Sequence, residues 1–489
     1  MVKEEKIMKR NTAKLILLAA AVIAASCAKE PATTEDIAQG YKINIEADFS
    51  ATKAVADGGA ATFAVGEQIC VYNKTRDALD ANLLSAASAG ANTTFSGTLA
   101  GTYAVGDVLQ LFYNTTSEVV DYTTQDGTIG GVADVAVATV SVTGVSGGTV
   151  STGKASFTNL QSIFKFTFKN GTSPLNVRAV TIRSAGGKLV AKDDQIADTK
   201  TYGAVSISND VAQPAVYAAL KFDANASDVI SFTLVDENGI LYTGTKAAPA
   251  GGLVDGKFYT SVVSVTPTAT MPFPFTISTG PATAAYLAAG NLYYKDGQYS
   301  FYPCKAPFYE PSESLLTAAE RRDRSWFQWS VVDTKFASSA STQDVYFNGT
   351  ASKGWFALTK DQVNCLISGR STLMDSGVAA IYKVTNTTGI LLPPDNATPA
   401  DVEGLLKDSN NSLTEPQVLR YISKGFAFLR CSGWYNSETS SKIGTKGYYW
   451  TATSYSDANA YECHFDSSVF PTTGNQPKTQ YFPVRLAHN

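Results

Sequence analysis

The sequence predicts a mainly β protein, with two β-sandwiches in tandem followed by an α+β domain. The chain has 489 residues, which at roughly 150 residues a domain corresponds to about three domains. Up to about residue 270, short runs of alternating apolar and polar residues are separated by turn signals, a pattern typical of antiparallel sheets. Beyond residue 320 the composition changes, because all five tryptophans and both histidines lie there.

The first 26 residues predict a signal peptide, which takes no part in the fold. Lys9 and Arg10 precede the apolar stretch "LILLAAAVIAAS", which is short for a membrane span. The small residues ending in Cys27 resemble a bacterial lipobox, although Ala24 stands where leucine is more common. This resemblance implies acylation of Cys27, a membrane anchor and a tether over residues 27–40. An ordinary signal peptide that ends in cysteine is the alternative.

Residues 41–155 predict the first sandwich. In "YKINIEADF" the apolar residues fall at every second position from Tyr41 to Phe49, which is the pattern of a half-buried strand. Lys53 follows in the unpatterned connection "SATKA". Further strands are expected in "ATFAVGEQICVYNK", "DVLQLFYN" and "VAVATVSVTGV".

Residues 156–267 predict the second sandwich. Its strands are expected in "SIFKFTFKNG", "VRAVTIRSAGGKLV" and "DVISFTLVDENGILYTG". The "ENG" between two alternating runs favours a hairpin, since glycine supplies the positive φ of a tight turn. The Pro- and Thr-rich residues 268–282 are expected to form an extended linker.

Residues 283–489 predict an α+β domain. A strand is expected before Gly290-Asn291 and another from there to Cys304. Apolar residues at helical spacing follow Thr359 in "TKDQVNCLIS", which favours a helix capped by Thr359. A second helix is expected in "LTEPQVLRYIS", and closely spaced strands in "GFAFLRCSGWY", "KGYYWTATSY", "NAYECHFDSS" and "QYFPVRLAHN".

The first two domains resemble the fimbrillin-like pilin family over about residues 40–267. The segments that carry the resemblance follow in the family's order: "TKAVADGGAATFAVGEQICVY", "TNLQSIFKFTFKN" and "DENGILYTGTKAAPAGGLVDGKFYTSVVSV". Gly66-Glu67 stands where the family commonly has Gly-Asp. The resemblance implies fimbrillin-type sandwiches and removal of the first strand of a lipidated precursor by a protease specific for Arg or Lys. A neighbouring subunit then fills the groove with a donor strand. Lys53 is the best-placed residue for the cut, which would leave Ala54 as the new N-terminus; a solvated loop lysine is the alternative.

The third domain resembles the C-type-lectin-like modules of bacterial surface proteins over about residues 283–489. Its matching segments stand in the family's order: Gly290-Asn291-Leu292, Leu391-Leu392-Pro393, Gly447-Tyr448-Tyr449-Trp450, Ala460-Tyr461 and Val484-Arg485-Leu486. The sugar-binding lectins hold calcium with carboxylate and amide oxygens. Glu415-Pro416-Gln417 approximates one such motif, but Trp450-Thr451-Ala452 has no carboxylate. We therefore expect no calcium-dependent sugar site.

Composition and motifs argue against several other functions. A net charge of -4 without a basic run argues against a nucleic-acid partner. No catalytic triad, P-loop or HExxH motif occurs, so we expect no enzyme, no cofactor and no metal site. Five cysteines remain after Cys27, and their odd number leaves at least one unpaired, so the disulfide pairing stays open: Cys70, Cys304, Cys365, Cys431 and Cys463. Cys431 and Cys463 fall in expected strands, where burial or a structural bridge is more typical than reactivity.

The sequence thus predicts a fimbrial tip or accessory pilin, located at the cell outer membrane and in cell-surface fimbriae. Its expected partners are other pilin subunits, and a surface glycan or protein of the host or of bacteria. Trp434 and Tyr435, which follow a Gly turn, and Tyr448 are the candidate ligand contacts, because exposed aromatic rings suit carbohydrate stacking. Trp450 is expected in the core, on the same face as Tyr448 and opposite Tyr449.

Two alternatives stay open. The first is a surface lipoprotein that binds glycan or protein and never polymerises. The second is a carbohydrate-processing enzyme, against which the missing acid/base pair counts. The resemblance to fimbrillin-like pilins implies that a polymerising subunit ends soon after its second sandwich with a free appendage strand, whereas this chain continues for more than 200 residues into a folded module. We therefore expect it to accept a donor strand without having one to give, which corresponds to the end of a fibre.

Overall fold

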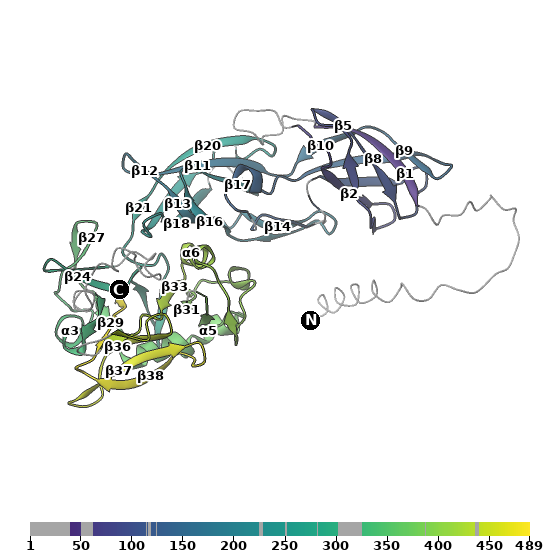
Figure 1. Ribbon diagram of the computed structural model, residues 1–489. Coiled ribbons are helices and arrows are strands. Elements are labelled where there is room, and N and C mark those ends of the chain that lie inside the picture. The colour runs from purple at the N-terminus through teal and green to yellow at the C-terminus, as the bar shows by residue number, and fades with distance from the viewer. Residues whose placement is uncertain are drawn as a thin grey trace, which may run out of the picture.

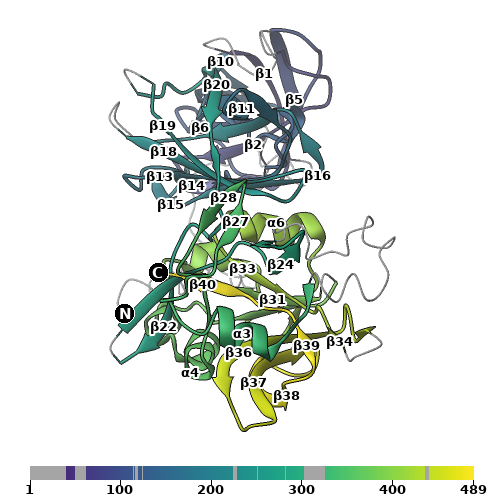
Figure 2. The same ribbon diagram turned by 90° about the vertical axis from the view of Figure 1, so that its left-hand side faces the viewer.

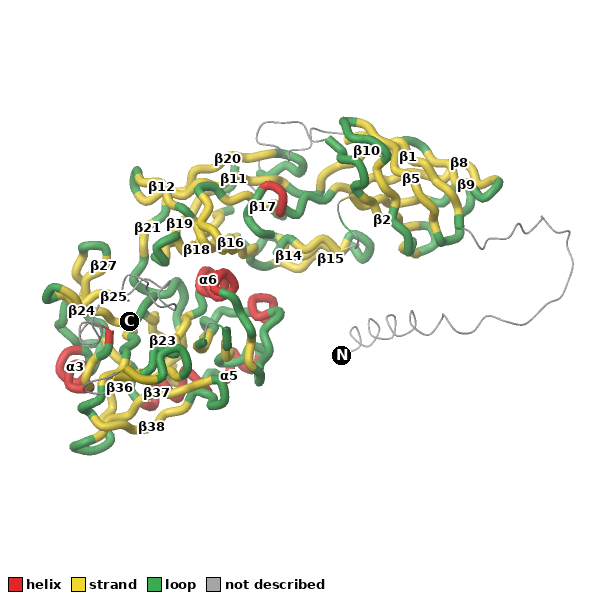
Figure 3. Tube along the Cα trace, viewed as in Figure 1, coloured by secondary structure: helices red, strands yellow, loops and turns green. Residues whose placement is uncertain are grey.

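The computed structural model of the chain describes residues 40–49, 62–113, 115, 119–123, 125–223, 228–249, 252–280, 282–301, 325–386, 388–435 and 440–489. These residues form mainly strands (Figure 3), so the prediction of a mainly β protein is confirmed. Two all-β bodies are followed by a C-terminal body that contains nearly all the described helices (Figure 1). Cys27, Lys53 and Ala54 lie outside the described residues. No helix in the described part of the chain is long and apolar enough to cross a membrane.

The first body is one sheet that closes on itself. Its path runs β10-β1-β5-β4-β2-β6-β8-β9, and further pairings join β10 to β8 and β1 to β9. The enclosed core holds Phe63, Phe95 and Phe157. The strands are β1 (Tyr41–Phe49), β2 (Gln68–Asn73), β3 (Ala78–Leu79), β4 (Leu84–Ala86), β5 (Asn92–Leu99), β6 (Val108–Tyr113), β8 (Ala136–Ser146), β9 (Thr149–Thr152) and β10 (Ala155–Asn159).

The second body packs sheets around a core that includes Phe166, Phe168 and Phe232. One sheet contains β12 (Ser173–Leu175), β11 (Ser162–Asn170), β17 (Val216–Leu220) and β20 (Phe258–Ser264). Another has the order β16 (Val205–Gln213), β13 (Val177–Ser184), β18 (Val229–Asp236), β19 (Leu241–Ala247) and β21 (Thr266–Pro267). The expected hairpin joins β18 to β19, with Gly239 at a φ of 78°.

The boundary between these two bodies is less simple than the sequence suggests. β7 (Val119–Asp121) pairs with β14 (Val190–Asp194), which also pairs with β15 (Thr199–Tyr202). Tyr122 and Val132 belong to the core of the second body, and η2 (Ile129–Gly131) lies between them. Residues 119–135 therefore leave the first body and pack on the second before the chain returns to β8.

The C-terminal body is built from several small sheets (Figure 1). One sheet has the strand order β22 (Phe275–Thr279), β23 (Ala282–Leu287), β40 (Leu486–His488) and β29 (Phe356–Ala357). A second has the order β24 (Leu292–Lys295), β25 (Gln298–Phe301), β27 (Val345–Phe347) and β28 (Thr350–Ser352). A third has the order β26 (Phe327–Gln328), β39 (Tyr481–Phe482), β34 (Trp434–Tyr435) and β35 (Ser440–Ser441). A fourth has the order β32 (Asn410–Asn411), β30 (Tyr382–Val384), β31 (Gly389–Leu392) and β33 (Ala427–Arg430). The last is β36 (Lys446–Ser454), β37 (Asn459–Asp466) and β38 (Thr472–Pro477).

The helices in the described part of this body are short. They are α3 (Trp329–Lys335), α4 (Lys360–Asn364), η4 (Cys365–Gly369), α5 (Ser371–Asp375), η5 (Pro399–Val402) and α6 (Glu415–Ser423). α4 begins behind Thr359 as predicted, and Gln362 completes a capping box. α6 begins behind Thr414, and it lies against the second body (Figure 2).

The expected linker contains a strand instead. β22 pairs with β23, and Phe275 and Ile277 are at most 1% exposed in the core of the C-terminal body. The Pro- and Thr-rich composition predicted an extended chain, and the backbone is extended, but its apolar side chains are buried by distant residues. The segment therefore belongs to the packed C-terminal body.

Candidate functional site

β1 occupies a central position in the first body. It pairs antiparallel with β5 from Tyr41 to Asp48, and parallel with β9 and β10 on its other side. Ile43, Ile45 and Ala47 are buried, as the alternating sequence predicts. β1 thus fills a position bordered by β5 on one side and by β9 and β10 on the other.

The C-terminal end of β1 is fixed by aromatic and ionic contacts. The Phe49 ring stacks on Phe63 at a centroid distance of 4.6 Å. The Asp48 carboxylate lies 2.5 Å from Lys154 Nζ and accepts a hydrogen bond of 2.6 Å from the Ser156 hydroxyl. The Asp48 contacts join β1 to the segment that carries β10, and all three contacts would be lost together with the strand.

A second group of polar and aromatic side chains lies on one face of the β36–β37–β38 sheet. Alternation along a strand places Lys446 and Tyr448 on the same face, and the register sets them opposite Asp466 and His464. The Tyr448 ring lies 4.9 Å from the Trp434 ring and 5.9 Å from the His464 ring. We call Trp434, Lys446, Tyr448, Glu462, His464 and Asp466 the β36–β37 face.

Hydrogen bonds organise the charges of the β36–β37 face. Glu462 is fully buried, and its carboxylate oxygens lie 3.0 and 3.2 Å from His464 Nδ1. The hydrogen bond to Glu462 raises the pKa of His464 above its ordinary value. A partly exposed imidazole is therefore held in place by a buried carboxylate, which favours its charged form.

The second ion pair of the face joins Lys446 Nζ to Asp466 at 3.2 Å. Burial alone would raise the pKa of Asp466, but hydrogen bonds from Ser468 and Val469, together with Lys446, hold it below its ordinary value. This face presents charged groups of both signs beside half-buried aromatic rings. Such a combination can accept hydrogen bonds, donate them and stack on a ligand ring.

The predicted ligand contacts are only partly placed as expected. Trp434 and Tyr448 are half-buried and lie together. Tyr435, predicted to be exposed, is 2% exposed, so that prediction is wrong. Its ring packs near Trp326 and Tyr481, contacts that neighbouring residues in the sequence do not reveal.

Trp450 is buried in the core with Phe482, as predicted. Tyr449 packs on the opposite side of the sheet against Phe465. The sequence analysis missed Glu462 and His464. The alternation of "YECHFD" places Glu462, His464 and Asp466 on one face once β37 is assigned, so the signal was present.

The motifs that resemble C-type-lectin-like modules form a structural network. Arg485 donates through Nε to Asn291 Oδ1 at 2.9 Å, and its other nitrogens donate to the carbonyls of Ala288 and Phe428. Asn291 also donates to the Tyr449 hydroxyl at 3.3 Å. These residues join β23, β33, β36 and β40, so they hold the fold together rather than face a ligand.

The motifs weighed for calcium and for thiol chemistry also lie in structural positions. Glu415 lies in the first turn of α6, 3.5 Å from Arg178 of the second body. Thr451 is fully buried. Burial raises the pKa of the Cys431 thiol to about 12 and raises that of Cys463 further, which disfavours the reactive thiolate. Within the described residues, no group of His, Cys, Asp and Glu could hold a metal ion.

Comparisons with known proteins give one family match. Residues 411–487 match a family model described as a domain of unknown function (DUF8237). The whole β36–β37 face lies within these residues. A search of curated proteins finds no match.

The chain is also similar to solved structures described as cell adhesion and fimbrial proteins. One is a candidate cell adhesion protein from Bacteroides uniformis, with 18% identity over 46% of this chain and 97% of that chain, at a TM-score of 0.31. Another is the tip fimbrial protein Mfa3 from Porphyromonas gingivalis with a C-terminal truncation, with 11% identity over 47% and 98%, at a TM-score of 0.26. A third is a fimbrial assembly protein from Parabacteroides distasonis, with 9% identity over 50% and 94%, at a TM-score of 0.26.

Proposed function

We propose that the protein is a fimbrial subunit, at the tip or in an accessory position, that loses β1 by proteolysis and accepts a donor strand in its place. It is anchored at the outer membrane through Cys27 before assembly, and its C-terminal body contacts the ligand. The observation that carries this proposal is the position of β1. It is the first described strand, it lies between β5 and the β9–β10 pair, and Lys53 follows it closely.

The energetics of β1 explain why a donor strand would be needed. Ile43 and Ile45 are at most 1% exposed, and full burial of each side chain stabilises by about 2 kcal/mol. Removal of β1 would uncover Phe95 and Phe157 and would leave the hydrogen-bonding edges of β5 and β9 unpaired. A strand from a neighbouring subunit, with the same alternation of apolar residues, would restore both.

The connection after the second body supports a position at the end of a fibre. β20 pairs with β11, and β21 pairs with β19. The chain then enters β22, whose Phe275 is buried in the C-terminal body. The described residues 252–280 thus hold no free strand that could be donated to another subunit.

The β36–β37 face supports ligand contact by the C-terminal body. Trp434 and Tyr448 provide partly exposed rings, and His464 and Lys446 provide charged groups beside them. This chemistry suits a surface glycan or a polar protein surface.

Fibre shearing tests the proposal. The protein should be recovered with sheared fibres, and immunogold label should lie at fibre ends or at sparse points. Label along the whole shaft would contradict the tip or accessory position. Recovery only with the outer membrane would favour a surface lipoprotein that does not polymerise.

A further inference from the structure

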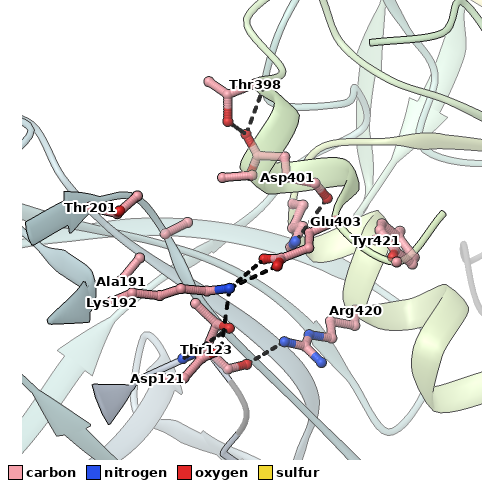
Figure 4. A pocket seen from close by; sticks show the side chains of 15 residues that line it. Asp121, Thr123, Ala191, Lys192, Thr201, Thr398, Asp401, Glu403, Arg420 and Tyr421 are labelled. Atoms are coloured by element: carbon pink, nitrogen blue, oxygen red, sulfur yellow. Dashed lines mark hydrogen bonds and ion pairs between the residues drawn. The ribbon is translucent and has the colours of Figure 1, made fainter. Parts of the chain in front are cut away.

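A cleft lies between the second body and the C-terminal body (Figure 4). Its volume is about 480 Å³, within the range of roughly 300–1,000 Å³ that is typical of small-molecule sites. Residues of β7, β14 and β15 line one wall, and residues of η5 and α6 line the other. Such a junction between domains is a common location for ligand sites.

The carboxylates in and around the cleft already have cationic partners. Lys192 Nζ lies 2.7 Å from Glu403 and 3.6 Å from Asp121. Arg183, just beyond the cleft, lies 3.7 Å from Asp401. These pairs account for all three carboxylates that line the described walls.

Arg420 of α6 and Lys424, the residue that caps the C-terminal end of this helix, have no such partner. Lys424 Nζ donates to the backbone carbonyl of Asp401 at 2.9 Å, and Arg420 Nη2 donates to the carbonyl of Thr123. Neither forms an ion pair within 4.0 Å with a carboxylate of the described residues. The Arg420 Nε is buried and has no hydrogen-bond partner in this part of the chain.

The charge of these two cations is only partly balanced. Neutral carbonyls alone do not offset the desolvation of a buried cation, and Asp401 and Glu403, which attract Lys424, already pair with Arg183 and Lys192. Burial lowers the pKa of Lys424 to about 8 and also lowers the pKa of Arg420. Asp401 and Glu403 attract Lys424, and Arg420 and Arg183 repel it. An anion in the cleft would stabilise both cations.

We propose that this cleft binds a small acidic saccharide, whose carboxylate or sulfate group is held by Arg420 and Lys424. Two further features fit a sugar. The half-buried Tyr421 ring lines the cleft, and Lys424 Nζ lies 5.4 Å from its centroid, so an acidic group bound by Lys424 would lie next to an apolar ring that can contact a sugar. Thr201 carries a hydroxyl that can exchange hydrogen bonds with a sugar, and the Thr398 hydroxyl, which already donates to Asp401 at 2.9 Å, can accept one.

Calorimetric titration of the whole chain tests this site with three probes: sodium glucuronate, sodium sulfate and glucose. Glucuronate should bind and glucose should not. Removing one charge-assisted contact, in Arg420→Gln or Lys424→Gln, should weaken glucuronate binding about tenfold or more. Lys407→Gln is the matched control, because Lys407 is an exposed cation away from the cleft, and it should leave the affinity unchanged.

A variant that is expected to bind more tightly distinguishes a specific effect on binding from misfolding. Glu403 is exposed, so Glu403→Gln should fold normally. It should bind glucuronate several-fold more tightly, because it removes a competing carboxylate and frees Lys192.

Three results would overturn the proposal. If glucose bound as tightly as glucuronate, the site would not recognise the anionic group. If sulfate bound as tightly as glucuronate, the site would not recognise the sugar. No binding, or full affinity in a folded Arg420→Gln variant, would exclude the site itself.

Discussion

The hydroxyl oxygens of Thr181 and Ser423 lie 2.8 Å apart, and both side chains are fully buried. Thr181 lies in β13 of the second body, and Ser423 lies in the last turn of α6. Thr181 also contacts the Ser206 hydroxyl at 2.9 Å, and Ser423 donates to the Arg420 carbonyl. A satisfied hydroxyl network therefore joins the second body to the C-terminal body, in addition to the ion pairs that cross the same junction.

Thr181→Val should lower the free energy of unfolding by about 1–2 kcal/mol, because it leaves buried hydroxyl partners unsatisfied. Thr245→Val, at an exposed position on β19, is the matched control. Urea unfolding monitored by tryptophan fluorescence measures the difference, since all five tryptophans lie beyond residue 320. Equal midpoints for the two variants would show that the contact is not stabilising.

The burial of β22 in the C-terminal core leads to a second prediction about stability. A fragment of residues 268–489 should unfold cooperatively and at a higher urea concentration than a fragment of residues 283–489. The shorter fragment lacks Phe275 and Ile277, which are buried in the C-terminal core, and leaves β23 without its partner. Equal midpoints would mean that residues 268–282 act as a linker after all.

The aromatic rings of the β36–β37 face should determine ligand binding. Trp434→Ala and Tyr448→Leu should each reduce binding of the whole chain on a glycan array by about tenfold, the loss expected for one stacked ring. Tyr286→Ala is the control, because Tyr286 is 38% exposed on β23 and lies outside this face. If the control loses binding equally, another surface carries the ligand.

The pair of His464 and Glu462 predicts a pH dependence of stability. The pKa of His464 is raised above 6.5 in the folded protein, so the folded state holds the proton more tightly than the unfolded state. This stabilisation is complete below about pH 6.5 and is lost as the pH rises through the folded pKa. Lys446 and Asp466 are further charged groups that act on His464.

The measurement compares urea midpoints of the wild type and His464→Gln between about pH 6 and pH 8. The wild type should lose stability as the pH rises, and the variant should lose less. Parallel pH profiles would contradict the assignment to His464.

Local patterns predicted β1 and the two faces of β36, because burial of one face of a strand imposes a period of two residues. Tyr448 and Trp450 do face away from Tyr449, and Thr359 does cap α4. The turn that splits the expected strand before Cys304 was missed. Asp296 and Gly297 both have positive φ there, and the "DG" dipeptide was its signal.

Tertiary contacts set the limits of prediction from the sequence. The partners that bury Tyr435 and Ile277 are distant in the chain, so local composition could not reveal them. The cleft joins Lys192 to Glu403, which are 211 residues apart. No periodicity predicts such a pair, and only the packing of α6 on the second body brings its walls together.

The N-terminus of the form found in fibres is the most direct test of the account. N-terminal sequencing of protein recovered from sheared fibres should begin at Ala54, because cleavage after Lys53 would remove β1 and open its position to a donor strand. A fibre-associated form that retains residues 41–49 would contradict strand removal and, with it, the proposed mode of assembly.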